Sequence, residues 1–290
     1  IYTLSLHDAL PIYVNDLDTV VARAIDEDQG RQDWTALLTD NAPARAQVIS
    51  RESAVVCGRA WVDATFRHLS AAVSVEWAVE DGDDVSPDTV LFTLAGPARA
   101  LLTGERTALN FLQTLSGTAT RTRAFVNAVR GTEAHIVDTR KTLPGLRTAQ
   151  KYAVRCGGGH NHRIGLFDGI LIKENHIRAA NGIANAIAAA RALDADVPLM
   201  TEAENLDEAH MALAHDVDVL LVDDFSLADL RTAVELTRQH RAAGGSTLLE
   251  YSGGARLDNV REIAETGVDR ISIGSLTKHV QAVDLSMRFL

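Results

Sequence analysis

After Gly131 the sequence repeats one pattern, a short apolar run followed by a longer amphipathic stretch. The runs are AHIVDTRK, GILIKE, VPLMTEAE, VDVLLVDD, TLLEYSGG and RISIGS. They recur about every 20 to 35 residues, a spacing that suits βα units and a parallel sheet. Six such units, without the strand order of a doubly wound sheet, predict an open or partial α/β barrel of about six parallel strands.

The part of the chain before Gly131 has a different character. Residues 18–38 begin with apolar positions at helical spacing, and residues 53–95 are β-branched, partly alternating and broken by Asp-Gly and Ser-Pro turns. We expect a helix in the first segment and a small antiparallel sheet in the second. A long helix is predicted next, with Thr103 as its N-cap, an apolar stripe of leucines and Gly131 as its stop.

Composition excludes several classes of protein. The net charge of −11 argues against a general nucleic-acid binder, and no apolar run approaches the roughly 18 residues that span a bilayer. Cys57 and Cys156 are too few for a disulfide framework, so a reduced, cytoplasmic setting is expected. Residues 1–12 have neither an initiator Met nor a signal-peptide pattern, and we interpret them as a foreign leader.

Each apolar run after Gly131 ends in polar, mostly ionisable residues. In a βα barrel these positions converge on one rim, where catalytic groups sit. A single polar strand end is equally well explained by contact with solvent, but two of the four lysines, Lys141 and Lys173, fall among these six ends. The candidate rim consists of Asp138, Thr139, Arg140, Lys141, Lys173, Glu174, Glu202, Asp223, Asp224, Glu250, Ser252, Gly253, Gly254, Ser272 and Gly274.

The residue types on this rim indicate the chemistry. Cationic side chains, Arg140, Lys141 and Lys173 together with Arg163, suit several carboxylates or phosphates. Carboxylates at Glu202 and Asp223 suit Mg²⁺, directly or through water, or ribose hydroxyls. We also expect the Ser252–Gly254 segment to open a helix whose N–H groups hold a phosphate. A polyanion, a hard cation and a sugar together predict a sugar phosphate or diphosphate substrate, and the Walker A pattern is absent.

A second cluster is Cys156-Gly157-Gly158-Gly159-His160-Asn161-His162-Arg163. A His-x-His pair could be part of a metal site, but no third ligand follows nearby. A plain helix-to-strand connection is the simpler interpretation. We favour a mobile loop that delivers His162 and Arg163 to an anion.

Four long blocks resemble the quinolinate phosphoribosyltransferase family: GERTALNFLQTLSGTAT, DTRKTLPGLR, AQKYAVRCGGGHNHRIGLFDGILIKENHI and ISIGSLT. The resemblance implies an N-terminal α/β sandwich domain over residues 13–116 and a barrel domain over residues 117–275. The C-terminal residues 276–290 are expected to pack back on the first domain. The resemblance also implies phosphoribosyl transfer to quinolinate with decarboxylation in NAD biosynthesis. It implies Mg²⁺ as cofactor and a homodimer with shared active sites.

The resemblance further implies a role for each site residue. Arg106 would reach into the barrel of the partner subunit. The two carboxylates of quinolinate and the diphosphate would be surrounded by Thr139, Arg140, Lys141, His162, Arg163 and Lys173. Glu202 and Asp223 would hold the ribose and Mg²⁺, and the 5′-phosphate would lie against Ser252, Gly253, Gly254, Ser272, Ile273 and Gly274. The residues expected to be catalytic are Lys141, Lys173, Glu202 and Asp223.

The sequence departs from the family pattern at Glu174, where Asp is usual, and at Lys278, where His is usual. Three alternatives stay open at this point. The chain could act on another acid, such as nicotinate or a molybdate-linked substrate, on the same scaffold. It could be a Schiff-base aldolase with a lysine at a strand end, although that lysine would need an apolar setting. It could also be a non-catalytic paralogue.

Overall fold

The computed structural model describes residues 16–290, and its internal contacts group them into two units. The first unit combines the chain up to Arg123 with residues 142–158 and 275–290, and the second holds residues 124–141 and 159–274. The predicted leader, residues 1–12, lies outside the described residues. Because the units interleave along the chain, a single domain boundary near residue 116 stays a prediction.

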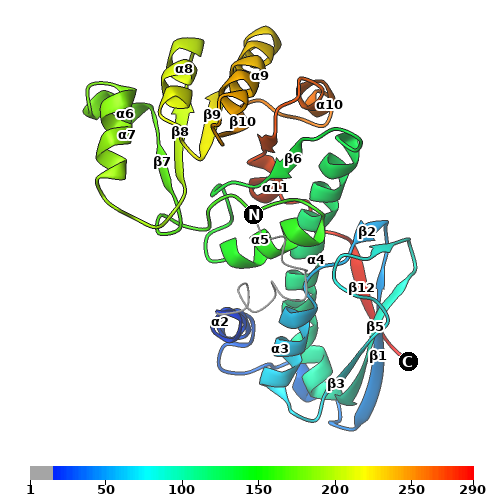
Figure 1. Cartoon of the computed structure of the whole chain (residues 1–290). Coiled ribbons are helices and arrows are strands. Elements are labelled where there is room, and N and C mark those ends of the chain that lie inside the picture. The colour runs from blue at the N-terminus through cyan, green and yellow to red at the C-terminus, as the bar shows by residue number, and fades with distance from the viewer. Residues whose placement is uncertain (1–15) are drawn as a thin grey trace. The chain divides into compact units, whose positions relative to one another are not determined.

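The first unit is built on an antiparallel sheet of strand order β12-β1-β5-β3, with β2 and β4 paired beside it (Figure 1). Its C-terminal strand pairs with the first strand of the unit along residues 46–50 and 285–289. The elements are α2 (Leu17–Gln29), η1 (Ala36–Leu38), β1 (Pro43–Ser50), β2 (Ala54–Val55), α3 (Arg59–Leu69), β3 (Ser74–Trp77), β4 (Asp84–Val85), β5 (Val90–Pro97), α4 (Ala98–Ala128), α5 (Arg147–Cys156), α11 (Ser275–Lys278) and β12 (Leu285–Phe289).

Helices α3 and α4 pack against this sheet. Their buried side chains, among them Phe66 and Leu112, form one apolar cluster with Val48 of β1 and Phe92 of β5. Gly104 allows the two helices to approach closely, because a Cβ at that position would lie 2.7 Å from the ring of Phe66. Helix and sheet therefore share one core, as an α/β sandwich requires.

Two expectations for this unit were wrong, and one strand had no signal in the sequence pattern. Residues 59–69 form helix α3, not part of the sheet, because Trp61, Val62 and Phe66 bury a helical face. Residues 43–50 form strand β1, for which no strand was expected. Helix α4 begins at Ala98, so Thr103 is not an N-cap, and its hydroxyl instead donates to Asp33 Oδ2 at 2.7 Å. The preceding Ala-Arg-Ala-Leu-Leu residues are strong helix formers and extend the helix backwards.

The second unit contains the six predicted strands in one parallel sheet of order β6-β11-β10-β9-β8-β7. Among the described strands, β6 and β7 are the two edges and do not pair, so the sheet is open as predicted. The elements are β6 (His135–Val137), β7 (Ile170–Ile172), α6 (Glu174–Ala179), α7 (Ile183–Arg191), β8 (Leu199–Ala203), α8 (Leu206–Ala214), β9 (Val219–Asp223), α9 (Leu227–Ala242), β10 (Leu248–Ser252), α10 (Val260–Ala264) and β11 (Arg270–Ser272).

The two faces of this sheet have different neighbours. Helices α7, α8 and α9 pack against its strands through small and branched side chains such as Ile187, Ala212 and Val234 (Figure 1). Met200, Val219 and Leu221 form a separate apolar cluster, to which Leu171 and Leu248 add. We call the face that carries this cluster the inner face. Because side chains alternate along a strand, it also carries the residues two and four positions further on.

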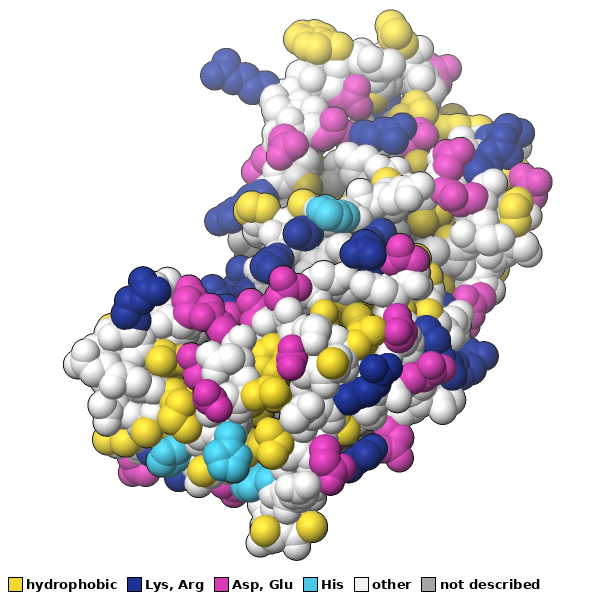
Figure 2. Space-filling view, turned by 90° about the horizontal axis from the view of Figure 1, so that it is seen from above, with side chains coloured by type: hydrophobic (Ala, Val, Ile, Leu, Met, Phe, Trp, Pro, Cys, Tyr) yellow, Lys and Arg dark blue, Asp and Glu magenta, His cyan; other side chains and the backbone are white. Residues whose placement is uncertain are grey.

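One face of the molecule carries charged side chains of both signs. On the face shown in Figure 2, acidic and basic side chains are interspersed, and no broad basic surface is seen there. Within residues 16–290, every helix is too short or too polar to cross a bilayer.

Candidate active site

A pocket of about 440 Å³ opens at the carboxyl ends of the strands of the second unit. The alternation of side chains explains its lining. Lys173, Glu202, Glu250 and Ser252 lie two or four residues beyond the apolar cluster of the inner face, so they form its polar continuation. The pocket is lined by Thr139, Arg140, Lys141, His162, Arg163, Leu166, Leu171, Lys173, His176, Glu202, Leu221, Glu250, Ser252 and Ser272.

Most of the predicted site residues of the second unit line this pocket, and others lie next to it. Asp223 pairs in register with Ser252, so it stands at the same strand end. A Cβ on Gly274 would lie 2.9 Å from Cδ of Lys141, so Gly274 backs that side chain. Ile273 is buried, and its N–H donates to the carbonyl of Val137. Arg106 belongs to α4 of the first unit, where it is exposed.

The cations at the pocket are placed for anions. The Nε of Arg140 is buried without a hydrogen-bond acceptor among the described residues. Arg163 donates from Nη1 to the carbonyl of Gly169 at 2.8 Å. Burial, followed by the charge of Arg140, lowers the pKa of Arg163 from its ordinary value, while Asp168 opposes this. Two guanidinium groups that repel each other and are partly desolvated favour the binding of a carboxylate or phosphate between them.

Lys173 and Glu202 form an ion pair on the inner face. The Nζ of Lys173 lies 2.5 Å from Oε2 of Glu202, whose side chain is buried. A Schiff-base enzyme needs an unprotonated amine in an apolar setting, which this carboxylate contact does not provide. The pair instead offers one positive and one negative group at neighbouring points of the pocket.

The segment from His160 to Arg163 is held along the edge strand β6. The N–H of His160 donates to the carbonyl of Ile136, and the N–H of Asp138 donates to the carbonyl of His160. The buried carboxylate of Asp138 accepts from the N–H of His162 at 2.9 Å and from Nδ2 of Asn161 at 2.6 Å. These contacts hold the segment against β6 and bring His162 and Arg163 to the pocket, and the mobility expected of it stays a prediction.

The glycine-rich strand ends also differ from expectation. Ser252 ends β10, and the following helix α10 begins only at Val260, so Ser252–Gly254 does not open a helix. Gly253 and Gly254 have φ of 100° and 58°, and a Cβ on Gly253 would lie 2.9 Å from the N–H nitrogen of Asp224. The segment is a tight turn that brings backbone groups to the strand end, and glycine is required by its conformation.

Sequence reasoning missed part of the pocket. The sequence pattern places Glu250 at a strand end but indicates no role for it, and the pocket also contains His176, Leu166, Leu171 and Leu221, which no motif marks. The period of two along β10 places Glu250 on the same face as Ser252, and that signal could have identified it. His176 accepts from the N–H of Lys173 through Nδ1 at 3.0 Å, which fixes the start of α6 beside the pocket.

The described residues contain no group of three or more His, Cys, Asp or Glu side chains that could hold a metal ion. Glu202 and Asp223 are therefore not completed to a metal cage by other such side chains there. A cation at this site would need oxygen ligands from a bound substrate or from water.

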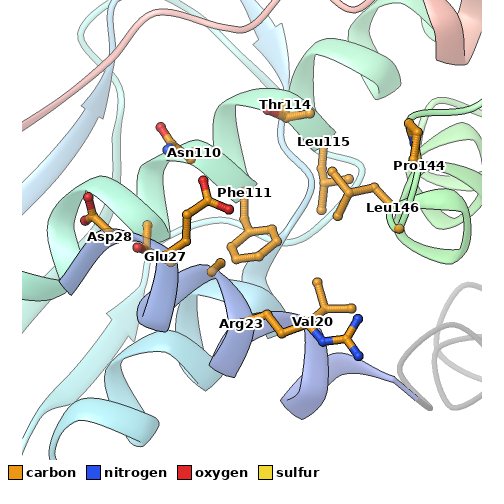
Figure 3. A pocket seen from close by; sticks show the side chains of 13 residues that line it. Val20, Arg23, Glu27, Asp28, Asn110, Phe111, Thr114, Leu115, Pro144 and Leu146 are labelled. Atoms are coloured by element: carbon orange, nitrogen blue, oxygen red, sulfur yellow. The ribbon is translucent and has the colours of Figure 1, made fainter. Parts of the chain in front are cut away.

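A second pocket, of about 430 Å³, lies in the first unit between α2, α4 and the segment before α5. Figure 3 shows Phe111 and Leu115 of α4 facing α2, with Val20 and Leu146 around them. Its lining contains none of the predicted site residues. This pocket therefore shares no side chain with the strand ends of the second unit.

Comparison with known proteins identifies the family. The quinolinate phosphoribosyl transferase N-terminal domain matches residues 33–116, and the C-terminal domain of the same family matches residues 118–288. The chain belongs to the quinolinate phosphoribosyltransferase family. The resemblance stated from sequence blocks alone is confirmed, and so is the fold class.

Individual relatives agree with this. The chain is similar to the nicotinate-nucleotide pyrophosphorylase (carboxylating) of Mycobacterium leprae, at 42% identity over 83% of this chain and 84% of that protein. The corresponding human protein is 36% identical, over 90% of this chain and 88% of its own length. The solved structure of nicotinate-nucleotide pyrophosphorylase from Francisella tularensis superposes with a TM-score of 0.91 at 42% identity, covering 94% of this chain and 96% of that one.

Proposed function

We propose that this chain transfers phosphoribosyl from phosphoribosyl diphosphate to quinolinate and decarboxylates the product, giving nicotinate mononucleotide, CO₂ and diphosphate. The observation that carries the proposal is the set of cations converging on one pocket: Arg140, Lys141, Arg163 and Lys173. Two carboxylates and a diphosphate need several cations at once, and a monocarboxylate does not. The family membership of both halves of the chain supports the same reaction.

The quinolinate carboxylates are assigned to the arginines. Arg140 has a buried Nε that lacks an acceptor among the described residues. Arg163 lies close to it, since the charge of Arg140, after burial, lowers the pKa of Arg163. A planar dicarboxylate between two guanidinium groups would satisfy both by paired hydrogen bonds. His162, Thr139, Lys141 and Lys173 complete the surroundings of quinolinate and the diphosphate.

Glu202 and Asp223 are assigned to the ribose. They stand on the adjacent strands β8 and β9, and carboxylates there would face the positive charge that develops on the sugar as the bond to diphosphate loosens. Oxygen donors of this kind also fit Mg²⁺, which the two side chains would hold through water or together with the diphosphate. Bound Mg²⁺ would neutralise charge on the leaving diphosphate.

The 5′-phosphate is assigned to the turn Ser252-Gly253-Gly254 and to Ser272, Ile273 and Gly274. Consecutive backbone N–H groups in turns with a left-handed residue form an anion-binding concavity without needing a helix. The positive φ values of Gly253 and Gly254 support that role.

The chemistry then needs positioning more than a strong base. The pyridine nitrogen of quinolinate attacks C1 of the ribose as the bond to diphosphate breaks. The 2-carboxylate then leaves as CO₂, its electron pair stays at C2 of the ring, and a proton from solvent takes its place. Cations around the ring stabilise the charge that this step creates, and fixed geometry supplies much of the rate.

We further propose a homodimer with shared active sites, in which Arg106 of one subunit completes the pocket of the other. Arg106 is exposed on α4 of the first unit, whereas the other assigned ligands belong to the second. A two-fold partner would give this side chain an anionic acceptor. The cytoplasmic setting stays a prediction, and relatives from rice and Arabidopsis are named chloroplastic.

The function is tested by incubating the protein with quinolinate, phosphoribosyl diphosphate and Mg²⁺ and measuring nicotinate mononucleotide and CO₂. Nicotinate, which lacks the 2-carboxylate, should be a poorer substrate by about a hundredfold, because a buried cation would be left unpaired. Equal turnover of the two acids would refute quinolinate as the specific substrate. It would favour the alternative that the chain uses the same scaffold to act on another acid.

A further inference from the structure

Glu250 is a fully buried carboxylate in the lining of the pocket. It belongs to the central part of β10 and is paired in register with Arg270 of β11, whose Nε lies 3.0 Å from Oε2. Neither carboxylate oxygen has a partner with hydrogen-bond geometry among the residues that the structure describes. Burial raises the pKa of Glu250, while the charge of Arg270 and the hydroxyl of Ser272 act in the opposite direction.

A carboxylate in this position is costly for stability alone. Buried ion pairs can often be replaced by apolar side chains of similar size without loss of stability, because desolvation offsets the attraction between the charges. The same strand already carries Leu248 on the inner face, two residues earlier. An apolar residue would therefore satisfy packing, and a buried charge next to a ligand pocket indicates a role in the site.

The other neighbour of Glu250 is His162. Nδ1 of His162 accepts a hydrogen bond from the N–H of Arg163 at 2.8 Å, so a neutral ring carries its proton on Nε2. Nε2 in turn lies 3.6 Å from Oε1 of Glu250. This separation exceeds that of a hydrogen bond, but a charge acts across it strongly where water is excluded.

The residues form a series that leads into the pocket. Glu250 faces Nε2 of His162, Nδ1 of His162 holds the backbone N–H of Arg163, and the guanidinium of Arg163 lines the pocket. We propose that Glu250 is a positioning residue, which orients the imidazole of His162 and through it sets Arg163 for binding the quinolinate carboxylates. This inference rests on the assignment of Arg163 to quinolinate made above.

The test is the variant Glu250→Gln, which keeps the shape of the side chain and removes its charge. Without the charge, the electrostatic interaction with the ring of His162 across 3.6 Å is lost, so KM for quinolinate should rise about fivefold to tenfold. KM for phosphoribosyl diphosphate should change less than KM for quinolinate, because Glu202 and Asp223, assigned to the ribose, lie on β8 and β9, and the backbone N–H groups assigned to the 5′-phosphate stay in place. A purely structural residue would not separate the two substrates in this way.

A double-mutant cycle with His162→Asn tests the route of the effect. The asparagine oxygen can replace Nδ1 as acceptor for the N–H of Arg163, but it presents nothing to Glu250 in place of Nε2. Adding Glu250→Gln to His162→Asn should therefore change KM for quinolinate less than about twofold. Additive effects of the two substitutions would overturn the proposal, and so would an unchanged KM in Glu250→Gln alone.

Arg270→Lys is the matched control, because it disturbs the same ion pair but leaves the carboxylate under His162. It should lower Tm as much as Glu250→Gln does and leave KM for quinolinate within about twofold. If Glu250→Gln does not fold, Glu250→Asp replaces it in the cycle, since the shorter side chain withdraws from His162 and keeps its charge. Equal KM changes in Arg270→Lys and in the Glu250 variant would refute the positioning role.

One further variant separates this inference from the assignment on which it rests. Arg163→Lys should raise KM for quinolinate strongly, because a single ammonium cannot make the paired contacts of a guanidinium. If Arg163→Lys raises KM for quinolinate and Glu250→Gln leaves it unchanged, only the positioning role fails. If Arg163→Lys leaves KM unchanged, the placement of quinolinate is wrong and the positioning role falls with it.

Discussion

Glu202→Gln should reduce turnover far more than it reduces stability. In the folded chain Oε2 of Glu202 accepts from Nζ of Lys173 at 2.5 Å, and the carboxylate side chain is only 9% exposed. Loss of a charge-assisted hydrogen bond costs about 1.5 to 3 kcal/mol. Because the side chain of Lys173 is 47% exposed, water replaces part of the contact, and we expect about 1 kcal/mol.

That loss corresponds to a fall in Tm of about 2 to 4 °C for a chain of this size. The effect on the reaction should be larger. A carboxylate that faces developing positive charge in a closed site is comparable to an oxyanion-hole donor, whose removal lowers kcat about 100- to 1000-fold, or about 3 to 4 kcal/mol. The assay is kcat and both KM values from nicotinate mononucleotide formation, together with Tm by thermal unfolding.

Glu204→Gln is the matched control, because Glu204 lies two residues further along the chain, is exposed and does not line the pocket. It should leave kcat within about twofold, as surface substitutions generally do. If Glu202→Gln loses stability but keeps kcat within about threefold, Glu202 is a structural residue. If it raises KM for quinolinate at unchanged kcat, the carboxylate binds the acid and the assigned roles are reversed.

Three further predictions follow from other parts of the molecule. Arg106→Ala and Lys173→Ala should each be inactive. Subunit exchange between the two variants should restore about a quarter of wild-type activity, since half of the dimers are mixed and each mixed dimer has one intact site. No recovery after proven exchange would refute the shared site. The N–H of Ala36 and the hydroxyl of Thr103 lower the pKa of Asp33 below its ordinary value of 3.8, so this carboxylate contributes stability above that pH and loses it as pH falls through the lowered pKa. Asp33→Asn should lower Tm by about 1 to 3 °C at pH 7, and the difference from wild type should shrink steadily as pH falls below 3.8. Cys57 and Cys156 are both buried, and burial raises the pKa of the Cys57 thiol. A disulfide reagent should therefore label both thiols slowly in the native protein and at once in denaturant. Fast labelling of the native protein would show that the α3–α5 region opens readily.

The strands of the second unit were predictable because their pattern is local. Each is a short apolar run bounded by polar residues, and a parallel strand covered on both faces needs just such a run. β9, for example, is Val-Leu-Leu-Val followed by Asp223. The convergence of Arg140, Lys173 and Glu202 followed from the rule that parallel strands present their carboxyl ends at one edge.

The first unit was less predictable. Trp61, Val62 and Phe66 are β-branched or aromatic, so local propensity favoured a strand, but contacts with α4 and the sheet select a helix for residues 59–69. Strand β1 owes its existence to partners far away in sequence, one of them the C-terminal strand β12. Pairing across such distances has no local signal.

The sequence by itself determined which segments become strands and which ionisable residues stand at their ends, because apolar periodicity and strand polarity are local properties. Only the tertiary structure decided which of those residues share a pocket. The register of β10 against β11 places Glu250 beside Arg270, and the carboxylate of Asp138 draws His162 against the edge of β6. Both arrangements depend on contacts between residues distant in the chain, and such contacts exist only once the sheet has formed.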